Sequence, residues 1–294
     1  MIGFFANIFG YILNFLYEFL NDYGLAIIVF SIILKLVLLP ISIKQQKSLK
    51  KTTKLQKEMK LIQEKYKNNP EKLNQETMEL YKRENMSPFS GCLSAIIQII
   101  LLFAMFYLVR SPLTYMKKVE PEIIEKYTNE MKDDAQEENK NSGYPEISVI
   151  REASKKLKEE NLPEEEKKEY EKLYVNMESL GLDLSSVPKN EMSNPKVFII
   201  PALYVISSFI SIKITSSINE KKKEKDKQKE KSEMDEVENA NKMMTWFMPF
   251  MSVSIAIVAP LGLALYWLVN NVLMIIERLI LNNFFDPKEE EGEA

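Results

Sequence analysis

The sequence predicts an all-α polytopic membrane protein with a core of five transmembrane helices. Charged residues make up 28 % of the chain and hydrophobic residues 46 %, and the two kinds are segregated into charged segments and long apolar runs. Several of these runs have about the 20 residues that a helix needs to cross a bilayer. The charged loops between the runs also predict, consistently, which side of the membrane each end of a helix faces.

The first predicted span, residues 23–43, is uncharged apart from Lys35. At about 1.5 Å per residue, a helix of this length extends roughly 30 Å, which matches the hydrocarbon core. A lysine at mid-membrane costs about 3 kcal/mol on insertion scales, and such charges usually face a helix-bundle interior or a water-filled cavity. The alternative is that Lys35 snorkels towards the end of the span, about 12 Å away along the helix. This residue alone leaves both interpretations open.

The four remaining spans follow from apolar length and one break. An uncharged run at 243–276 would extend roughly 50 Å as one helix, which is too long for a single span. Pro260 interrupts it near the middle, so two spans that form a hairpin are expected. The predicted spans are 88–109, 197–218, 243–259 and 261–281.

Loop charges predict which side of the membrane each loop occupies. Residues 44–87 carry twelve Lys/Arg and six Asp/Glu, and the charged loop 219–242 begins with three lysines after Glu220. By the positive-inside rule both loops are cytoplasmic, which places the N-terminus outside and the acidic tail 282–294 inside. The long loop 110–196 is then extracellular. We expect a helical or partly disordered surface module there, with helical stretches such as 151–160.

Residues 1–22 have the pattern of an amphipathic helix. One helical face collects polar residues and the other collects large apolar ones, which suits a helix lying in the outer membrane interface. A sixth span is the alternative. We expect no cleaved signal peptide, because a basic start and a small-residue cleavage site are both missing. The polar face comprises Asn7, Asn14, Glu18 and Asn21, and the apolar face comprises Phe4, Phe5, Ile8, Phe15 and Phe19.

The cytoplasmic loop 44–87 predicts a helical hairpin. Two apolar stripes at helical spacing flank a turn in which Asn69 can cap the second helix and Pro70 can take its first position. The lysines of this loop can be a solvated face and topology signal, or can contact anionic lipid, ribosomal RNA or a partner. The stripes are Leu55, Met59, Ile62 and Tyr66, and then Leu73, Thr77, Leu80 and Tyr81.

Composition argues against an enzyme. The chain has no histidine and a single cysteine, Cys92, so it can form neither an internal disulfide, nor a cysteine or histidine metal site, nor a histidine-based triad. It also lacks a phosphate-binding loop and a dinucleotide fingerprint. We therefore expect no cofactor and no nucleotide.

Five phrases, in this order, resemble YidC-type membrane protein insertases, bacterial members of the YidC/Oxa/Alb superfamily. The resemblance covers roughly residues 23–109 and 197–281, and residues 180–184 resemble the family segment that precedes the third span. The phrases are Tyr23–Ile28 with Lys35-Leu36 and Leu39-Pro40; Ile62–Lys67; Glu79–Lys82; Ser87–Leu93 with Gln98; and Pro260–Trp267.

The resemblance implies a five-helix core around a hydrophilic groove that is open to the cytoplasm and to lipid. It also implies a positive side chain on the first span, and Lys35 matches that position. The family residue is usually arginine; lysine keeps the charge but loses the planar fork that binds carboxylates bidentately. Ser94 and Ser87 replace a usual proline and asparagine, and the outer loop is longer than in many relatives.

Other polar and aromatic residues of the spans are candidates for the substrate groove. Ser31 lies four residues before Lys35 on the same helical face, and Gln98 matches a groove glutamine of the family. Either side chain could instead bond to a backbone carbonyl, and the aromatic residues could simply pack between helices. The candidate groove residues are Lys35, Ser31, Gln98, Ser207, Ser208, Ser211, Tyr266 and Trp267.

The expected function is insertion and folding assistance of newly made membrane proteins in the bacterial plasma membrane. Nascent membrane proteins are the expected partners, and the ribosome, the Sec translocon and anionic lipids are further candidates. Two other functions stay open. A membrane transporter could use Lys35 as the counter-ion of its substrate, and a non-catalytic membrane scaffold could bind partners through the hairpin 44–87.

Overall fold

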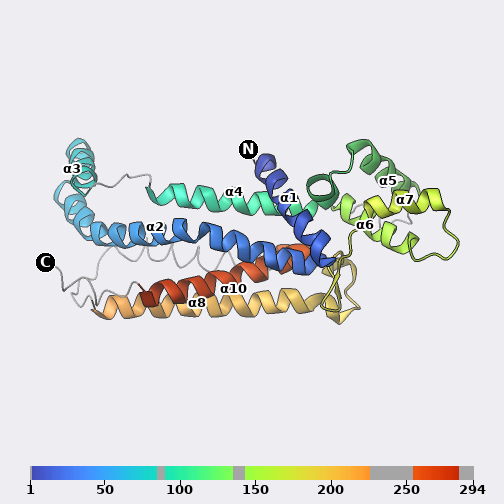
Figure 1. Ribbon diagram of the computed structural model, residues 1–294. Coiled ribbons are helices and arrows are strands. Elements are labelled where there is room, and N and C mark those ends of the chain that lie inside the picture. The colour runs from blue at the N-terminus through green and yellow to red at the C-terminus, as the bar shows by residue number, and fades with distance from the viewer. Residues whose placement is uncertain (1, 85–89, 135–142, 226–253, 285–294) are drawn as a thin grey trace. The chain divides into compact units, whose positions relative to one another are not determined.

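The computed structural model describes residues 2–84, 90–134, 143–225 and 254–284 (Figure 1). Among these residues the strands form one short two-stranded sheet, and the other regular elements are helices. The all-α class is therefore confirmed. Its strands are β1 (Glu178–Ser179) and β2 (Leu182–Asp183). The longer helices are α1 (Ile2–Leu20), α2 (Tyr23–Lys65), α3 (Pro70–Arg83), α4 (Ser90–Arg110), α5 (Pro121–Asp134), α6 (Pro145–Lys156), α7 (Glu164–Leu173), α8 (Ile199–Lys225) and α10 (Leu261–Phe284).

Four described helical segments are long and apolar enough to cross a membrane: Gly3–Leu20, Tyr23–Gln45, Pro195–Ser217 and Leu261–Asn282. They confirm a polytopic membrane protein, and three of them overlap predicted spans. The predicted span 88–109 begins outside the described residues and continues as the apolar helix Ile99–Arg110. The predicted span 243–259 lies mostly outside the described residues.

Helix α1 has a buried face in addition to the polar face and the apolar face that the sequence predicted. Ala6, Phe9 and Leu13 are buried, while Phe15 and Phe19 expose 70 % and 83 % of their surface. Because α1 meets the length and apolarity of a span, the interfacial helix and the sixth span both stay predictions.

Helix α2 runs without a break through the end of the first predicted span at residue 43. Its 43 residues extend about 65 Å, roughly twice the hydrocarbon thickness, so part of the helix must project from a membrane. Pro40 lies inside this helix. Proline lacks the N–H for a backbone hydrogen bond and its ring crowds the preceding turn, which destabilises the helix locally.

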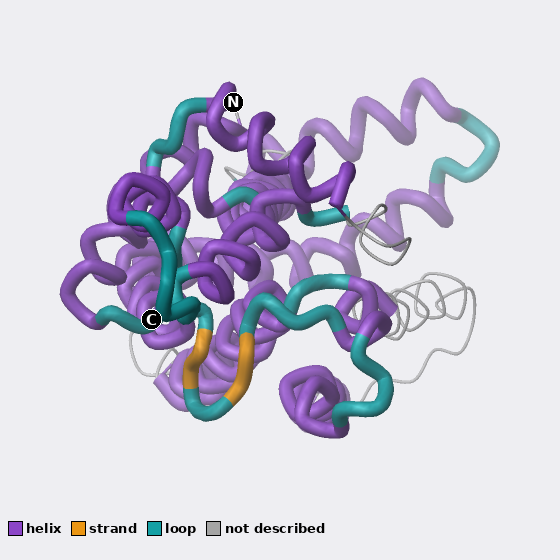
Figure 2. Tube along the Cα trace, turned by 90° about the vertical axis from the view of Figure 1, so that its right-hand side faces the viewer, coloured by secondary structure: helices purple, strands orange, loops and turns teal. Residues whose placement is uncertain are grey.

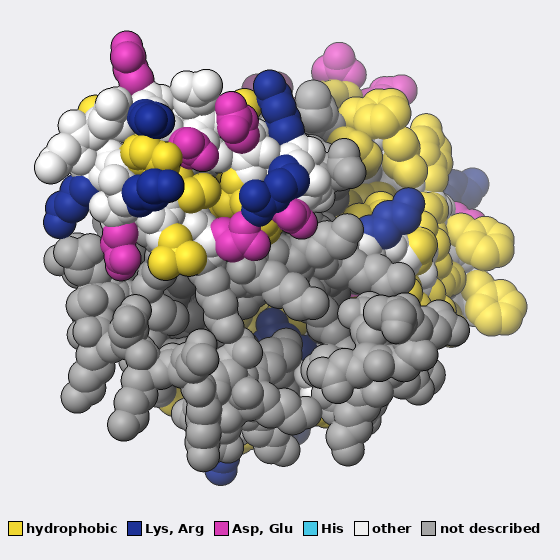
Figure 3. Space-filling view, turned by 90° about the vertical axis from the view of Figure 1, so that its left-hand side faces the viewer, with side chains coloured by type: hydrophobic (Ala, Val, Ile, Leu, Met, Phe, Trp, Pro, Cys, Tyr) yellow, Lys and Arg dark blue, Asp and Glu magenta, His cyan; other side chains and the backbone are white. Residues whose placement is uncertain are grey.

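Residues 34–104 form a compact unit in which α3 folds back on the end of α2. Asn69 Oδ1 accepts a hydrogen bond from Lys72 N at 3.1 Å, and proline takes the first helical position, so the predicted cap is confirmed. Tyr81 Oη donates to Met59 Sδ at 3.4 Å, and Leu80 is buried. Figure 3 shows Lys/Arg and Asp/Glu side chains interspersed on a described patch at the upper left of the view, as on an ordinary solvated helical surface.

The other unit comprises Gly3–Ile33 and Met105–Ala294, and within it the predicted extracellular loop is largely helical. Helices α5, α6 and α7 precede the short β1–β2 hairpin, which Figure 2 shows as the two orange segments. The helix expected at 151–160 corresponds to α6. It begins earlier, because Pro145 occupies a first helical turn, and it ends at Lys156.

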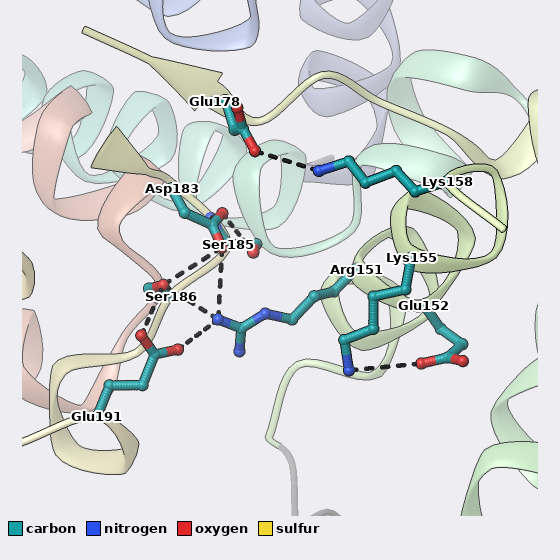
Figure 4. Close-up of polar contacts among 9 residues, drawn as sticks. All are labelled: Arg151, Glu152, Lys155, Lys158, Glu178, Asp183, Ser185, Ser186 and Glu191. Atoms are coloured by element: carbon teal, nitrogen blue, oxygen red, sulfur yellow. Dashed lines mark hydrogen bonds and ion pairs between the residues drawn. The ribbon is translucent and has the colours of Figure 1, made fainter. Parts of the chain in front are cut away.

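Arg151 on α6 holds the segment that follows β2 (Figure 4). Its guanidinium lies 3.4 Å from Asp183 Oδ2 and 3.2 Å from Ser186 Oγ, and it also pairs with Glu191. Partial burial alone would lower the pKa of Arg151, but the hydrogen bonds and charges of Glu191 and Asp183 raise it. This network fixes the position of residues 183–191 against α6.

Glu146, at the start of the same helix, binds the chain that follows α4. Its carboxylate is buried and accepts hydrogen bonds from Thr114 N at 3.0 Å and Thr114 Oγ1 at 2.6 Å. Burial raises the pKa of Glu146, and the hydrogen bonds from Thr114 partly oppose that shift. Glu146 therefore fixes α6 against the end of α4 just beyond Arg110.

The chain around β1 and β2 caps two candidate spans. The first N–H groups of a helix have no partner within the helix itself. Here Tyr23 N donates to Asn176 O at 3.1 Å, Leu261 N to Ser186 O at 2.9 Å, and Gly262 N to Leu184 O at 2.9 Å. One stretch, 176–186, thereby fixes the starts of both α2 and α10.

We predict that Gly24→Ala destabilises the protein, because the added Cβ would lie 2.4 Å from Ser179 Oγ and 2.8 Å from Leu184 Cδ1. Overpacking of this kind costs about 1–3 kcal/mol. Thermal unfolding in detergent should show the loss. Gly3→Ala is the matched helical control, since its nearest neighbour would be 3.9 Å away. Equal melting temperatures for the two variants would contradict the close approach at Gly24.

Candidate functional site

Helices α8 and α10 pack side by side over their length (Figure 1). The rings of Tyr204 and Trp267 lie 6.3 Å apart, Asn271 Nδ2 donates to Ser207 Oγ at 2.9 Å, and Arg278 Nη1 donates to Thr215 Oγ1. Each of these pairs is 63 or 64 residues apart in sequence. A constant separation means that the two helices run parallel, so these contacts form successive layers along one interface.

The polarity of α8 is the reverse of that in a water-soluble protein. Its buried stripe towards α10 contains small hydroxyl residues, and its exposed positions carry large apolar side chains. Small and hydroxyl residues are enriched between helices in membranes, where lipid solvates the apolar outer face. The buried residues are Ser207, Ser208 and Ser211, and the exposed ones are Leu203, Ile206, Phe209 and Ile210.

The three candidate serines therefore lie together in the α8–α10 interface. Ser207 Oγ donates to Tyr204 O at 2.8 Å, and Ser211 O accepts a hydrogen bond from Thr215 Oγ1 at 2.7 Å. Ser207 and Ser208 also accept from Asn271 Nδ2, at 2.9 Å and 3.2 Å. The hydroxyl groups of Ser207 and Ser208 thus meet the Asn271 amide between the two helices, whereas Ser211 takes part through its backbone carbonyl.

Asn271 is a central residue of this interface that sequence reasoning missed. It exposes 9 % of its surface, whereas its neighbour Asn270 is exposed. The signal was a pair of amides inside an otherwise apolar run, which is unusual in a predicted span. The sequence could not say which of the two faces a partner helix.

The candidate aromatic residues of α10 have different surroundings. Tyr266 is buried, while Trp267 is partly exposed and faces Tyr204. The indole Nε1 of Trp267 is buried and finds no hydrogen-bond acceptor among the described residues. Trp267 therefore presents one buried polar donor inside a largely aromatic contact.

Ser31 belongs to the same unit as this cluster, whereas Lys35 and Gln98 belong to the other unit. Ser31 is 4 % exposed and donates to Ile27 O at 2.7 Å, which is the backbone bond that the sequence left open as an alternative. Lys35 and Gln98 belong to the unit 34–104, and the side chain of Gln98 is not among those described.

Lys35 lies on the less exposed side of α2. Lys35 and its neighbours Leu34 and Leu38 are partly buried, whereas Leu36 and Val37 expose 63 % and 66 % of their surface. Lys35 thus lies on the same, less exposed side of the helix as Ser31.

The charged groups that the structure describes offer no metal centre: they contain no group of three or more His, Cys, Asp or Glu side chains that could hold a metal ion. The polar chemistry available in the described spans is that of hydroxyl and amide groups, one indole N–H and charged side chains that include Lys35, Lys213, Glu277 and Arg278.

We predict that Asn271→Ala lowers the thermal stability of the protein in detergent, because it removes two hydrogen bonds between α8 and α10. Interhelical hydrogen bonds in membranes contribute on the order of 0.6–2 kcal/mol each. The control is Asn270→Ala, one residue away and exposed. A melting temperature that falls equally for both variants would show that the Asn271 bonds contribute nothing specific.

A known family model matches most of this chain. The model is described as the 60Kd inner membrane protein, and it matches residues 15–289. The match includes the candidate groove residues on α2, α4, α8 and α10.

Individual relatives match a shorter part. A membrane protein insertase YidC of Chlorobaculum tepidum is 48 % identical over 100 residues, which are 34 % of this chain and 17 % of that protein. One from Fusobacterium nucleatum is 41 % identical over 102 residues, which are 35 % of this chain and 50 % of that protein. The chain thus spans at most half the length of these relatives.

Proposed function

The chain belongs to the 60Kd inner membrane protein family, and from this membership we propose that it inserts newly made membrane proteins into the bacterial membrane and assists their folding. Relatives that carry the name membrane protein insertase support this assignment. In this chain the proposal is carried by the position of Lys35. This residue is a cation within a candidate span and lies on the partly buried side of its helix. Such a charge is costly in lipid and usually serves a function.

In the proposed mechanism, Lys35 acts on the charge of the client. A short acidic tail of a client segment enters a hydrophilic groove from the cytoplasm, and the ammonium group lowers the cost of moving its carboxylates partway across the membrane. Candidate groove residues are Ser31, Gln98, Ser207, Ser208, Ser211, Tyr266 and Trp267. Their hydroxyl and amide groups would replace part of the water that the client tail leaves behind.

The remaining driving forces need no nucleotide. Moving one elementary charge across the membrane potential is worth about 2.3 kcal/mol per 100 mV. Burial of the client's apolar segment in lipid adds a favourable hydrophobic term. Together these terms can complete the translocation of a short tail once Lys35 has drawn it partway across.

The proposed orientation places the N-terminus outside and the C-terminus in the cytoplasm. The excess of Lys/Arg in 44–87 and the lysines after Glu220 support it. The hairpin 44–87 would then face the cytoplasm, where nascent chains arrive. We propose nascent membrane proteins as the substrates; the ribosome, the Sec translocon and anionic lipids are candidate partners of the hairpin.

We predict that Lys35→Arg retains insertion, whereas Lys35→Glu lowers it roughly tenfold or more for a client with an acidic outer tail. Lys35→Glu reverses the sign of the charge on the span, so attraction of the client's carboxylates becomes repulsion. A change of about 1.4 kcal/mol in this interaction already changes insertion by a factor of ten. The measurement is protease protection of the client tail in cells depleted of their own insertase. Lys213→Glu, at an exposed lysine of α8, is the control. Normal insertion by Lys35→Glu at normal protein levels would refute the proposal.

Cysteine labelling tests whether water reaches the proposed groove. In a Cys92→Ser background, cysteines at Lys35 and Gln98 should react with a polar thiol reagent added from the cytoplasmic side, because a hydrophilic groove admits water there. A cysteine at Val37, whose side chain is exposed on an apolar face, should react poorly if lipid covers it. Ser31→Cys should react more slowly than Lys35→Cys, since position 31 is buried. Equal labelling from outside would favour a transporter over an insertase.

A further inference from the structure

Arg278 is a cation within a candidate span that the proposed mechanism does not use, and its side chain is partly buried, whereas that of Lys213 on α8 is exposed. It lies inside Leu261–Asn282, about 6 Å from the end of that segment at 1.5 Å per residue. Together with Glu277 it makes up all the charge of the predicted span 261–281. The sequence pattern did not single it out, because the pair is formally neutral and lies near the end of the run.

The side chain of Arg278 belongs to the α8–α10 interface. Its Nη1 donates to Thr215 Oγ1, and Thr215 in turn donates to Ser211 O at 2.7 Å. The exposed apolar positions of this part of α10 are Ile276, Leu279 and Ile280, whereas Arg278 is partly buried. The guanidinium therefore continues the polar layers that begin at Asn271.

Thr215 occupies a small part of the donor capacity of Arg278. A guanidinium has five N–H donors in a planar fork. In the described part of the chain, Thr215 is the one hydrogen-bond acceptor of Arg278. Thr215 can stabilise the orientation of the fork and still leave donors for a ligand, which must be an anion to match a cation held in a span.

We propose that Arg278 is a second anion-recognition residue for the client, and that it binds the carboxylates of an acidic tail near the cytoplasmic end of α10. The inference rests on the proposed function. Lys35 can attract such a tail only as a point charge, whereas Arg278 can bind one carboxylate with two parallel hydrogen bonds. Arg278 lies about 6 Å from the end of its candidate span, so in the proposed orientation it would meet the tail near the cytoplasmic surface.

Glu277 limits this attraction. Its carboxylate precedes Arg278 directly in the chain, and one of its oxygens is buried. A client carboxylate therefore competes with the field of Glu277, which makes binding at Arg278 weak and reversible. Such binding suits a tail that has to move on across the membrane.

The experiment compares two clients that differ only in their outer tail, one with Asp and Glu and one with Asn and Gln at the same positions. Insertion is measured by protease protection for the wild type, Arg278→Gln, Arg278→Lys and Thr215→Val, with melting temperatures in detergent alongside. We expect Arg278→Gln to lower insertion of the acidic-tail client roughly fivefold and to leave the neutral-tail client unchanged. Arg278→Lys should retain most of the insertion of the acidic-tail client.

Thr215→Val is the matched structural control, since it removes the acceptor but keeps the cation. It should lower the melting temperature and lower insertion of both clients by the same factor. Glu277→Gln should raise the ratio of acidic-tail to neutral-tail insertion, because it removes the competing charge. For the variant Arg278→Glu, a client whose tail carries lysines in place of its acidic residues should insert better than the client with the acidic tail.

Two results would overturn the proposal. Equal losses for both clients in Arg278→Gln, with a lowered melting temperature, would make Arg278 a structural link between α8 and α10. Unchanged insertion of both clients would show that Arg278 has no part in client recognition. Failure of the proposed function would look different, because the wild-type protein would then insert neither client.

Discussion

The need to satisfy every backbone polar group without water governs this structure. Lipid offers no hydrogen bonds, so the first N–H groups of a membrane-spanning helix need partners from the protein itself. Residues 176–186 supply carbonyl groups to the starts of both α2 and α10. The helical module of α5, α6 and α7 is attached to this same stretch by Arg151 and to the chain after α4 by Glu146. The module therefore does more than cover a surface: it completes the helices on which the candidate residues lie.

The same constraint explains why polar side chains gather between α8 and α10. Ser207 and Thr215 donate to carbonyl groups of their own helix, and Asn271 bridges to Ser207 and Ser208. These hydroxyl and amide groups, which would be costly in lipid, have partners inside, whereas Trp267 Nε1 has none among the described residues. Exposed positions of α8 are large and apolar for the complementary reason. These contacts stabilise the packing of α8 and α10 whether or not a client is present, so the proposed function is argued from the cations Lys35 and Arg278 and not from the neutral polar residues.

Local patterns could be predicted from the sequence, and distant partnerships could not. Apolar length indicated the spans, and the Asn69-Pro70 pair indicated a helix start, because both depend on neighbours along the chain. The continuity of α2 past residue 43 was missed, since a change from apolar to charged residues does not require a break in a helix. The capping of Tyr23 by Asn176 joins residues far apart in sequence, and no local pattern encodes it. Asn271 and Arg278 were visible as polar residues, but their facing towards α8 became apparent only from the packing.

In the proposed function, Lys35 and Arg278 are two cations of different chemistry that suit a substrate which has to pass and not stay. A carboxylate held bidentately by a guanidinium and screened from water would be slow to leave, whereas an ammonium group gives attraction with little directional demand. Arg278 is moderated by Glu277, and Lys35 lacks the fork, so neither residue forms a strong trap for a client tail. Each carboxylate needs only enough stabilisation to offset part of its dehydration, because the membrane potential and burial of the apolar segment supply the rest. In the proposed function, weak charge contacts at Lys35 and Arg278 would therefore let an acidic tail pass across the membrane without being held there.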